Sequence, residues 1–136
     1  MNRVILMGHL GDRPELRTFP NGDAYITFRM CTDEPYKDAA ASEDDRWQTR
    51  PEWHNVKFTG RSATNLATML RKGQQVMVEG KLHTRPYDDA QGAKRFFTEV
   101  KARQVVMTSG RRRDDEDGDP ELVFGGARSM SIPAAA

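Results

Sequence analysis

The chain has a single cysteine, no long apolar run and almost no net charge. The lone thiol, Cys31, excludes an internal disulfide and is typical of proteins in a reducing compartment. There is no apolar stretch of membrane-spanning length and no signal-peptide pattern, so we expect a cytoplasmic protein. The formal net charge of +1 excludes strong overall attraction for a polyanion. Any binding of that kind must therefore depend on locally clustered cations.

The sequence also lacks the clustered side chains that catalysis or metal binding requires. His9 and His83 have no cysteine or carboxylate nearby at ligand spacing. The acidic pairs Asp33-Glu34 and Asp88-Asp89 lie among ordinary turn residues, and no pairing of a nucleophile with a base is suggested. We therefore expect no enzyme, no metal and no cofactor. A nuclease or phosphatase is the catalytic alternative, and incubation with a labelled substrate and magnesium would reveal its turnover.

Charge is distributed unevenly along the 136 residues. Residues 1–110 hold 17 Lys/Arg and 14 Asp/Glu, a balance of +3, whereas residues 111–136 hold 4 and 6, a balance of −2. The length fits one domain followed by a tail. We predict a domain over residues 1–109 and a disordered tail over residues 110–136, because the tail is rich in Gly, Pro, Ala and acidic residues.

Alternation of apolar and polar residues predicts mostly strands. One helix is predicted over residues 60–73, with Ser62 as N-cap and Gly73 at the C-terminal end. In the fourth strand, Val76, Val78, Gly80 and Leu82 are expected to face inward. Residues 33–50 and 86–93 read as polar loops. The strands are expected at residues 4–10 with an extension at 16–19, then 24–32, 52–59, 75–84 and 95–107.

The third strand is the most informative part of the chain. His54, Val56 and Phe58 alternate with Trp53, Asn55, Lys57 and Thr59, which gives one mainly apolar face and one face carrying an indole, an amide and an ammonium. An exposed Trp beside Lys suits a surface that stacks a base and neutralises a phosphate. The alternative is an edge strand whose Trp is half covered by a loop.

Several motifs occur together in a fixed order. They are the N-terminal stretch 2–17 with Gly8-His9-Leu10-Gly11, then Pro20-Asn21-Gly22, the strand 52–58, Leu70-Arg71-Lys72-Gly73 and Val78-Glu79-Gly80-Lys81-Leu82. With these spacings the chain resembles the bacterial-type single-stranded DNA-binding proteins from about residue 2 to residue 107. The combination is much more specific than any single motif.

Three strands, a helix and two further strands match an all-β architecture, the five-stranded Greek-key barrel called the OB-fold. The resemblance implies the same fold, and a five-stranded α+β sheet that does not close is the structural alternative. The resemblance also implies a homotetramer that coats single-stranded DNA without sequence specificity. It would act in replication, recombination and repair, associated with the nucleoid.

Aromatic and cationic side chains are the candidate DNA-binding groups. The resemblance implies stacking roles for Tyr36, Trp53 and Tyr87, and Trp47 is a further aromatic candidate. The family commonly has another aromatic at the position of Thr59; Phe58 falls on the opposite side by alternation and is expected in the core. The candidate phosphate contacts are Arg3, Lys57, Arg61, Lys72, Arg85 and Arg95.

Two further sites are expected to contact proteins. The resemblance places His54 at a subunit contact, where protonation could loosen the assembly. Relatives end in an acidic segment with an apolar tip that recruits replication and repair proteins. Here the corresponding residues lie internally, as Asp114, Asp115, Glu116, Asp117 and Phe124, and could form a displaced docking segment. A tail without a partner is the alternative.

Two other functions compete with DNA coating. The first is an OB-fold interaction module of the primosomal replication protein type, which acts mainly through protein partners. The presence of Trp53 together with Tyr36, Tyr87 and a tail favours DNA coating over this role. The second is double-stranded DNA binding, which is disfavoured because the sequence predicts no basic helix suited to a major groove.

Overall fold

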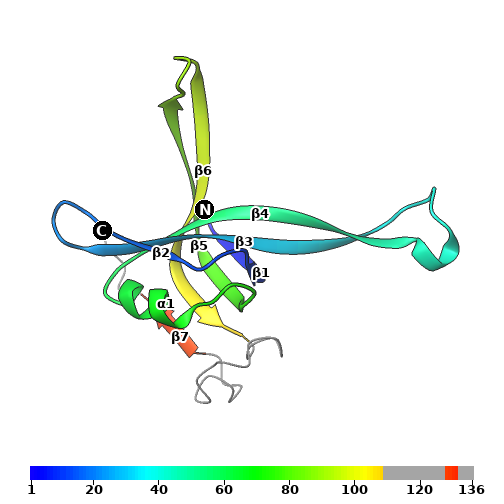
Figure 1. Cartoon of the computed structure of the whole chain (residues 1–136), viewed down its shortest axis with the longest axis horizontal. Coiled ribbons are helices and arrows are strands. Elements are labelled where there is room, and N and C mark those ends of the chain that lie inside the picture. The colour runs from blue at the N-terminus through cyan, green and yellow to red at the C-terminus, as the bar shows by residue number, and fades with distance from the viewer. Residues whose placement is uncertain (109–127, 132–136) are drawn as a thin grey trace.

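The structure is a computed structural model that describes residues 1–108 and 128–131. It is built mainly from strands, with one α-helix and a single 3₁₀ turn in the described part of the chain (Figure 1). The elements are β1 Val4–Leu10, β2 Glu15–Thr18, β3 Ala24–Lys37, η1 Glu43–Asp45, β4 Trp47–Thr59, α1 Ala63–Met69, β5 Gln75–Asp88, β6 Lys94–Met107 and β7 Arg128–Ser131.

Five strands close into a barrel because β1 pairs with two different strands. It runs antiparallel to β5 from Val4 to His9, and it also pairs with β3 through His9 and Leu10. The remaining contacts complete the ring in the order β1-β5-β6-β4-β3-β1, with β4 and β6 parallel. Strand β2 adds to β3, and β7 adds to β6. This closure confirms the predicted five-stranded barrel with one helix and excludes an open sheet.

The alternating apolar residues of the strands form the barrel core. Ile26 and Met30 of β3 and Phe58 of β4 are fully buried, as the alternation predicts. Leu66 of α1 and Leu70, just after the helix, join the same core. Burying a side chain of this size contributes about 1.5–3 kcal/mol, so the inward face of each strand is strongly specified.

Both predicted polar loops are too long, because strands occupy residues 33–37 and 47–50 of the first and residues 86–88 of the second. Strands β3 and β4 pair without interruption to Lys37 and Trp47, and β5 and β6 pair to Asp88 and Lys94. The two hairpins extend from the barrel as long arms in different directions (Figure 1). The sequence did not indicate these strands, because the segments lack the apolar alternation that marks a strand. They pair through backbone hydrogen bonds, which do not depend on the side chains.

The helix is shorter than predicted. It spans Ala63–Met69, and the predicted cap Ser62 lies at its N-terminal end without a side-chain cap hydrogen bond. Gly73 lies beyond the C-terminal end with a φ of +81°, and its N–H donates to the Leu10 carbonyl oxygen. Leu82, predicted to face inward, is 50% exposed because it lies where β5 leaves the barrel.

Candidate nucleic-acid interface

The outward face of β3 and β4 carries the central ring of the site. Trp53 pairs in register with Cys31 and remains 49% exposed, although its strand neighbours Val56 and Phe58 are buried in the core. The predicted division of this strand into an apolar inward face and an outward face that carries Trp53 is therefore confirmed. Trp53 is available for stacking by one side of its indole.

Two residues hold the Trp53 indole in place. The Arg29 guanidinium carbon lies 4.7 Å from the ring centroid, a cation–π arrangement. A Cβ built on Gly11 would lie 2.5 Å from Cζ3 of the indole. Any residue larger than glycine at this position would therefore push the ring away, and the close approach explains why glycine suits it.

Lys57, on the same face as Trp53, contacts a second aromatic group. Its Nζ lies 4.6 Å from the Tyr25 ring centroid and 4.9 Å from that of Phe19. The two rings are themselves 4.4 Å apart. The predicted phosphate-binding cation is thus part of a small aromatic cluster, which orients its ammonium along the outward face.

The register of the β3–β4 arm separates the predicted rings. Trp47 and Trp53 are an even number of residues apart on β4 and share the outward face, and Trp47 is 70% exposed. Tyr36 pairs with Gln48 and falls on the opposite face. Arg50 lies over the Tyr36 ring at 4.7 Å, and the Tyr36 hydroxyl donates to Gln48. The arm therefore presents aromatic rings on both of its faces.

The β5–β6 arm repeats this two-sided arrangement. Tyr87, which is 42% exposed, pairs with Arg95 and shares its face with Arg85, whose guanidinium lies 5.0 Å from the Phe97 ring centroid. Phe96 pairs with Pro86 on the other face and is 70% exposed. Phe96 was not among the predicted site residues.

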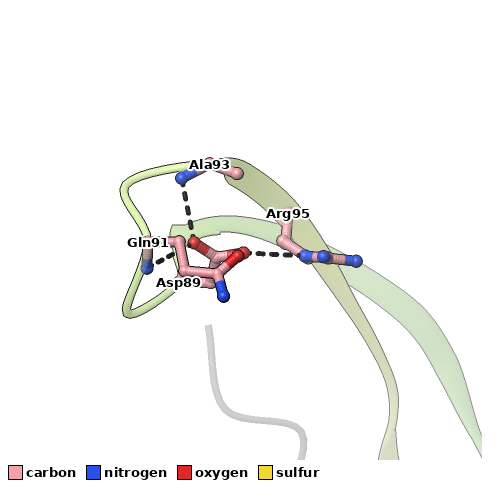
Figure 2. A network of polar contacts seen from close by, with 4 residues as sticks. All are labelled: Asp89, Gln91, Ala93 and Arg95. Carbon is pink, nitrogen blue, oxygen red and sulfur yellow. Dashed lines mark hydrogen bonds and ion pairs between the residues drawn. The ribbon is translucent and has the colours of Figure 1, made fainter.

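The tip of this arm is held by one carboxylate (Figure 2). Asp89 Oδ1 accepts the backbone N–H groups of Gln91 and Ala93, and Oδ2 accepts from Arg95 Nε at 3.0 Å. The Arg95 hydrogen bond, followed by the bond from the Ala93 amide, lowers the pKa of Asp89. The predicted phosphate contact Arg95 is thus already paired with a carboxylate.

The other predicted cations lie in different surroundings. Arg3 pairs with Glu79 at 2.9 Å, and Arg103 pairs with the same carboxylate at 3.2 Å. Arg61 precedes helix α1 and Lys72 follows it, so both belong to the helical end of the barrel. The structure therefore groups Lys57 and Arg85 with aromatic rings, and it places Arg3, Arg61 and Lys72 elsewhere.

Two residues on β3 and β4 have roles apart from these rings. His54 is partly buried, and its Nε2 lies 2.8 Å from Thr32 Oγ1. Burial, assisted by the Asp33 carboxylate, raises the pKa of the Cys31 thiol. The raised pKa disfavours the thiolate, which is the nucleophilic form of a cysteine.

Sequence reasoning missed the two arginines that cover rings. Alternation alone places Arg29 on the outward face, because it lies two residues from Cys31 on the same strand, and Cys31 pairs with Trp53. This residue could therefore have been found from the sequence. Arg50 falls in a predicted loop, where odd and even positions do not alternate between two faces. The sequence therefore does not indicate on which side of the chain Arg50 lies. Phe96 has the same parity as the buried Val100, so the pattern indicates core, and only the geometry of the arm exposes it.

Asp114, Asp115, Glu116, Asp117 and Phe124 lie outside the described residues. Among residues 1–108 and 128–131, no cluster of three or more His, Cys, Asp or Glu side chains is suited to a metal ion. Within those same ranges, no helix is long and apolar enough to span a membrane.

Comparison with known proteins completes the description. The model of the Single-strand binding protein family matches residues 1–108. A solved structure described as the Plasmodium falciparum SSB complex with ssDNA has a TM-score of 0.63 and 23% sequence identity. The match covers 98% of this chain and 96% of that chain. At this level of identity the structural likeness establishes a shared fold.

Proposed function

The chain belongs to the single-strand binding protein family, and we propose that it coats single-stranded DNA without base specificity during replication, recombination and repair. Binding would use both arms and the barrel face between them. We propose that the protein is cytoplasmic and associated with the nucleoid, because that is where single-stranded DNA is exposed on the chromosome. The proposed action is binding and protection, without turnover of the DNA.

The observation that carries this proposal is the outward Trp53 with its cations. The exposed indole of Trp53 offers a π-surface. Arg29 lies over one side of it and Lys57 lies further along the same face, so positive charge is next to the ring. Bases of any identity can stack on such a ring, and phosphates can meet the cations. Trp47, Tyr36 and Tyr87 extend the same chemistry along the arms, with Arg85 beside Tyr87.

Cations that are already paired with a carboxylate, or that lie beside helix α1, have a smaller part in this proposal. Arg3 and Arg95 must exchange a carboxylate for a phosphate, whereas Arg61 and Lys72 flank helix α1. We propose that they steer the backbone of the DNA and that the ring-bearing arms hold it. Each phosphate that is neutralised makes the negative slope of log affinity against log salt steeper by about 0.7.

The proposed homotetramer is supported by the free side of β1. Among the described strands, only β5 pairs with residues 4–8, so the opposite edge of β1 there is open to another strand. Ile5 and Met7 lie exposed on the outer face of β1. An open edge beside exposed apolar side chains is a surface that folded proteins usually cover. His54 is proposed to contact a neighbouring subunit.

A second proposed role concerns protein partners. The acidic segment that ends in Phe124 has the composition of a docking peptide for replication and repair proteins. The experiment is a pulldown of a helicase or polymerase subunit with the full chain and with residues 114–124 deleted. Loss of the partner with retained DNA binding would support the role, and an unchanged pulldown would remove it.

The test of the main proposal is a titration with oligo-dT at several salt concentrations, followed by intrinsic tryptophan fluorescence. Stacking on Trp53 should quench the signal saturably, whereas duplex DNA of equal length should have little effect. If neither ligand changes the signal and labelled oligo-dT also fails to bind, DNA coating is wrong and the interaction-module role takes its place. Release of labelled fragments in magnesium would overturn the proposal that binding is the only action.

A further inference from the structure

Phe96 lies on the face of the β5–β6 arm that continues the inner surface of the barrel. It pairs in register with Pro86, and four residues further along β6 Val100 has the same orientation and is 3% exposed in the core. The β5–β6 arm projects away from the barrel (Figure 1). Phe96 therefore has the parity of a core residue but is 70% exposed.

The apolar surface around Phe96 is too narrow for a stable protein partner. The other large exposed apolar side chain on this face is Leu82, four positions from Pro86, or about 13 Å along β5. Thr84 and Thr98, joined by a 2.9 Å hydrogen bond, lie between them. A specific protein interface buries about 800 Å² on each partner, which a two-stranded ribbon with two separated apolar groups does not supply.

The same surroundings suit a single nucleobase. A base needs only one ring of comparable size, and stacking does not depend on which base it is. Lys94 precedes Phe96 by two residues on β6, so its ammonium lies on the same face and can meet a phosphate. Asp88 pairs with Lys94 in register and limits the net charge there, so stacking must provide most of the binding.

The arm is also prepared to hold such a ring still. Asp89 fixes the turn through two backbone N–H groups and Arg95, so the strands are held together close to Phe96 (Figure 2). A ring on a rigid element loses less conformational freedom on binding. The other arm shows the same arrangement, because Tyr36 occupies the inner face there and Trp47 the outer face.

Resting on the proposed function, we infer that Phe96 stacks a nucleobase on the side of the β5–β6 arm opposite Tyr87. A bound strand then passes around the arm and contacts both of its faces. Tyr87 would hold one part of the strand and Phe96 another. The arm as a whole would contact more nucleotides than its outer face could.

The test compares Phe96→Ala, Phe96→Leu and Phe96→Tyr in the full chain, using labelled oligo-dT and fluorescence anisotropy. Loss of one stacked base should weaken binding roughly 5- to 150-fold in the alanine variant. Binding of oligo-dT by the leucine variant should be weakened to a similar degree, because leucine keeps apolar area but lacks the ring. The tyrosine variant should bind like the wild type.

Leu82→Ala is the matched control, because it removes an exposed apolar group from the same face without removing a ring. Its affinity should remain that of the wild type. If the wild type binds and Phe96→Ala binds equally well, the inference is overturned while the proposed function stands. It is also overturned if Phe96→Ala changes the sedimentation coefficient and leaves affinity intact, because the ring would then be a subunit contact. Failure of the wild type to bind would overturn the proposed function itself.

Discussion

The Arg29 guanidinium covers one side of the Trp53 indole, with its carbon 4.7 Å from the ring centroid. Gly11 contacts the edge of the same indole. Together they leave the ring about half exposed and fixed in direction. A stacked base would meet a ring that already carries a cation, and cation–π contacts of this kind contribute about 0.5–1 kcal/mol at exposed sites.

Trp53→Ala should weaken binding of oligo-dT by roughly 5- to 150-fold, because one base loses its stacking partner. Trp53→Phe should be intermediate, since a smaller ring remains. Fluorescence anisotropy of the labelled oligonucleotide measures both variants without relying on the indole. Equal affinity in all three proteins would show that Trp53 is not part of the DNA contact.

Replacing Arg29 tests whether its charge or its planar shape matters. Arg29→Met should weaken binding and, if the guanidinium also contacts a phosphate, reduce the log–log salt slope by about 0.7. Arg29→Lys keeps the charge but loses the flat stacking group, so it should restore the slope and only part of the affinity. The slope is measured by titration between low and moderate salt. An unchanged slope in Arg29→Met would limit Arg29 to positioning the ring.

Gly11 and Gly8 form a matched pair for separating binding from stability. A Cβ at position 11 meets a surface indole, whereas a Cβ at position 8 would lie 2.1 Å from the Cys31 backbone oxygen. Gly11→Ala should displace Trp53 and weaken DNA binding with little loss of stability. Gly8→Ala should destabilise the barrel by more than about 1 kcal/mol, because backbone must move. Urea unfolding and oligo-dT titration of both variants should show this contrast, and a reversed pattern would contradict it.

The Asp89 network should make the order of the arm tip dependent on pH. The pKa of Asp89 is lowered in the folded protein, so its contribution is fully present above the ordinary Asp pKa of about 3.9. That contribution is lost as the pH falls through the lowered value. Asp89→Asn keeps one acceptor for the two backbone amides but loses the carboxylate that pairs with Arg95.

Amide hydrogen exchange at Gln91 and Ala93 measures this effect. Once the data are corrected for the intrinsic pH dependence of exchange, protection in the wild type should fall in strong acid. In Asp89→Asn it should be lower at neutral pH and change less with pH. Asp88→Asn is the control, because its carboxylate neighbours the turn but lies outside the network drawn in Figure 2. Equal protection in Asp89→Asn and the wild type would contradict the prediction.

Charges on the outer face of β1 should disrupt the proposed assembly. Ile5→Glu combined with Met7→Glu places two carboxylates where another subunit is expected to pack, so sedimentation equilibrium should give a smaller particle. Leu16→Glu on β2 is the control, because Leu16 is also an exposed apolar residue but lies on a different strand. If both variants have the mass of the wild type, the β1 face is not a subunit contact.

The barrel could be predicted because its core obeys alternation. Ile26, Phe28 and Met30 on β3 and Val56 and Phe58 on β4 are buried as their spacing indicates. The arms could not be predicted in the same way, because residues such as Asp33, Glu34 and Arg50 carry no apolar pattern. Their pairing depends on backbone hydrogen bonds that any sequence can form. The helix and its N-cap position Ser62 were predicted correctly, but the helix ends at Met69, before the predicted end at Gly73.

By itself, the sequence determined which residues of each strand face the core and where the predicted helix falls. It also determined that Trp53 and Lys57 share an outward face. Those features follow from side-chain periodicity, which is local. Only the tertiary structure decided that β1 closes the barrel against β3, that Arg29 covers Trp53 and that Phe96 is exposed. These features depend on where strands that are distant in sequence meet and where a hairpin leaves the barrel. Parity shows that two residues share a face, but only the packed fold shows whether anything covers that face.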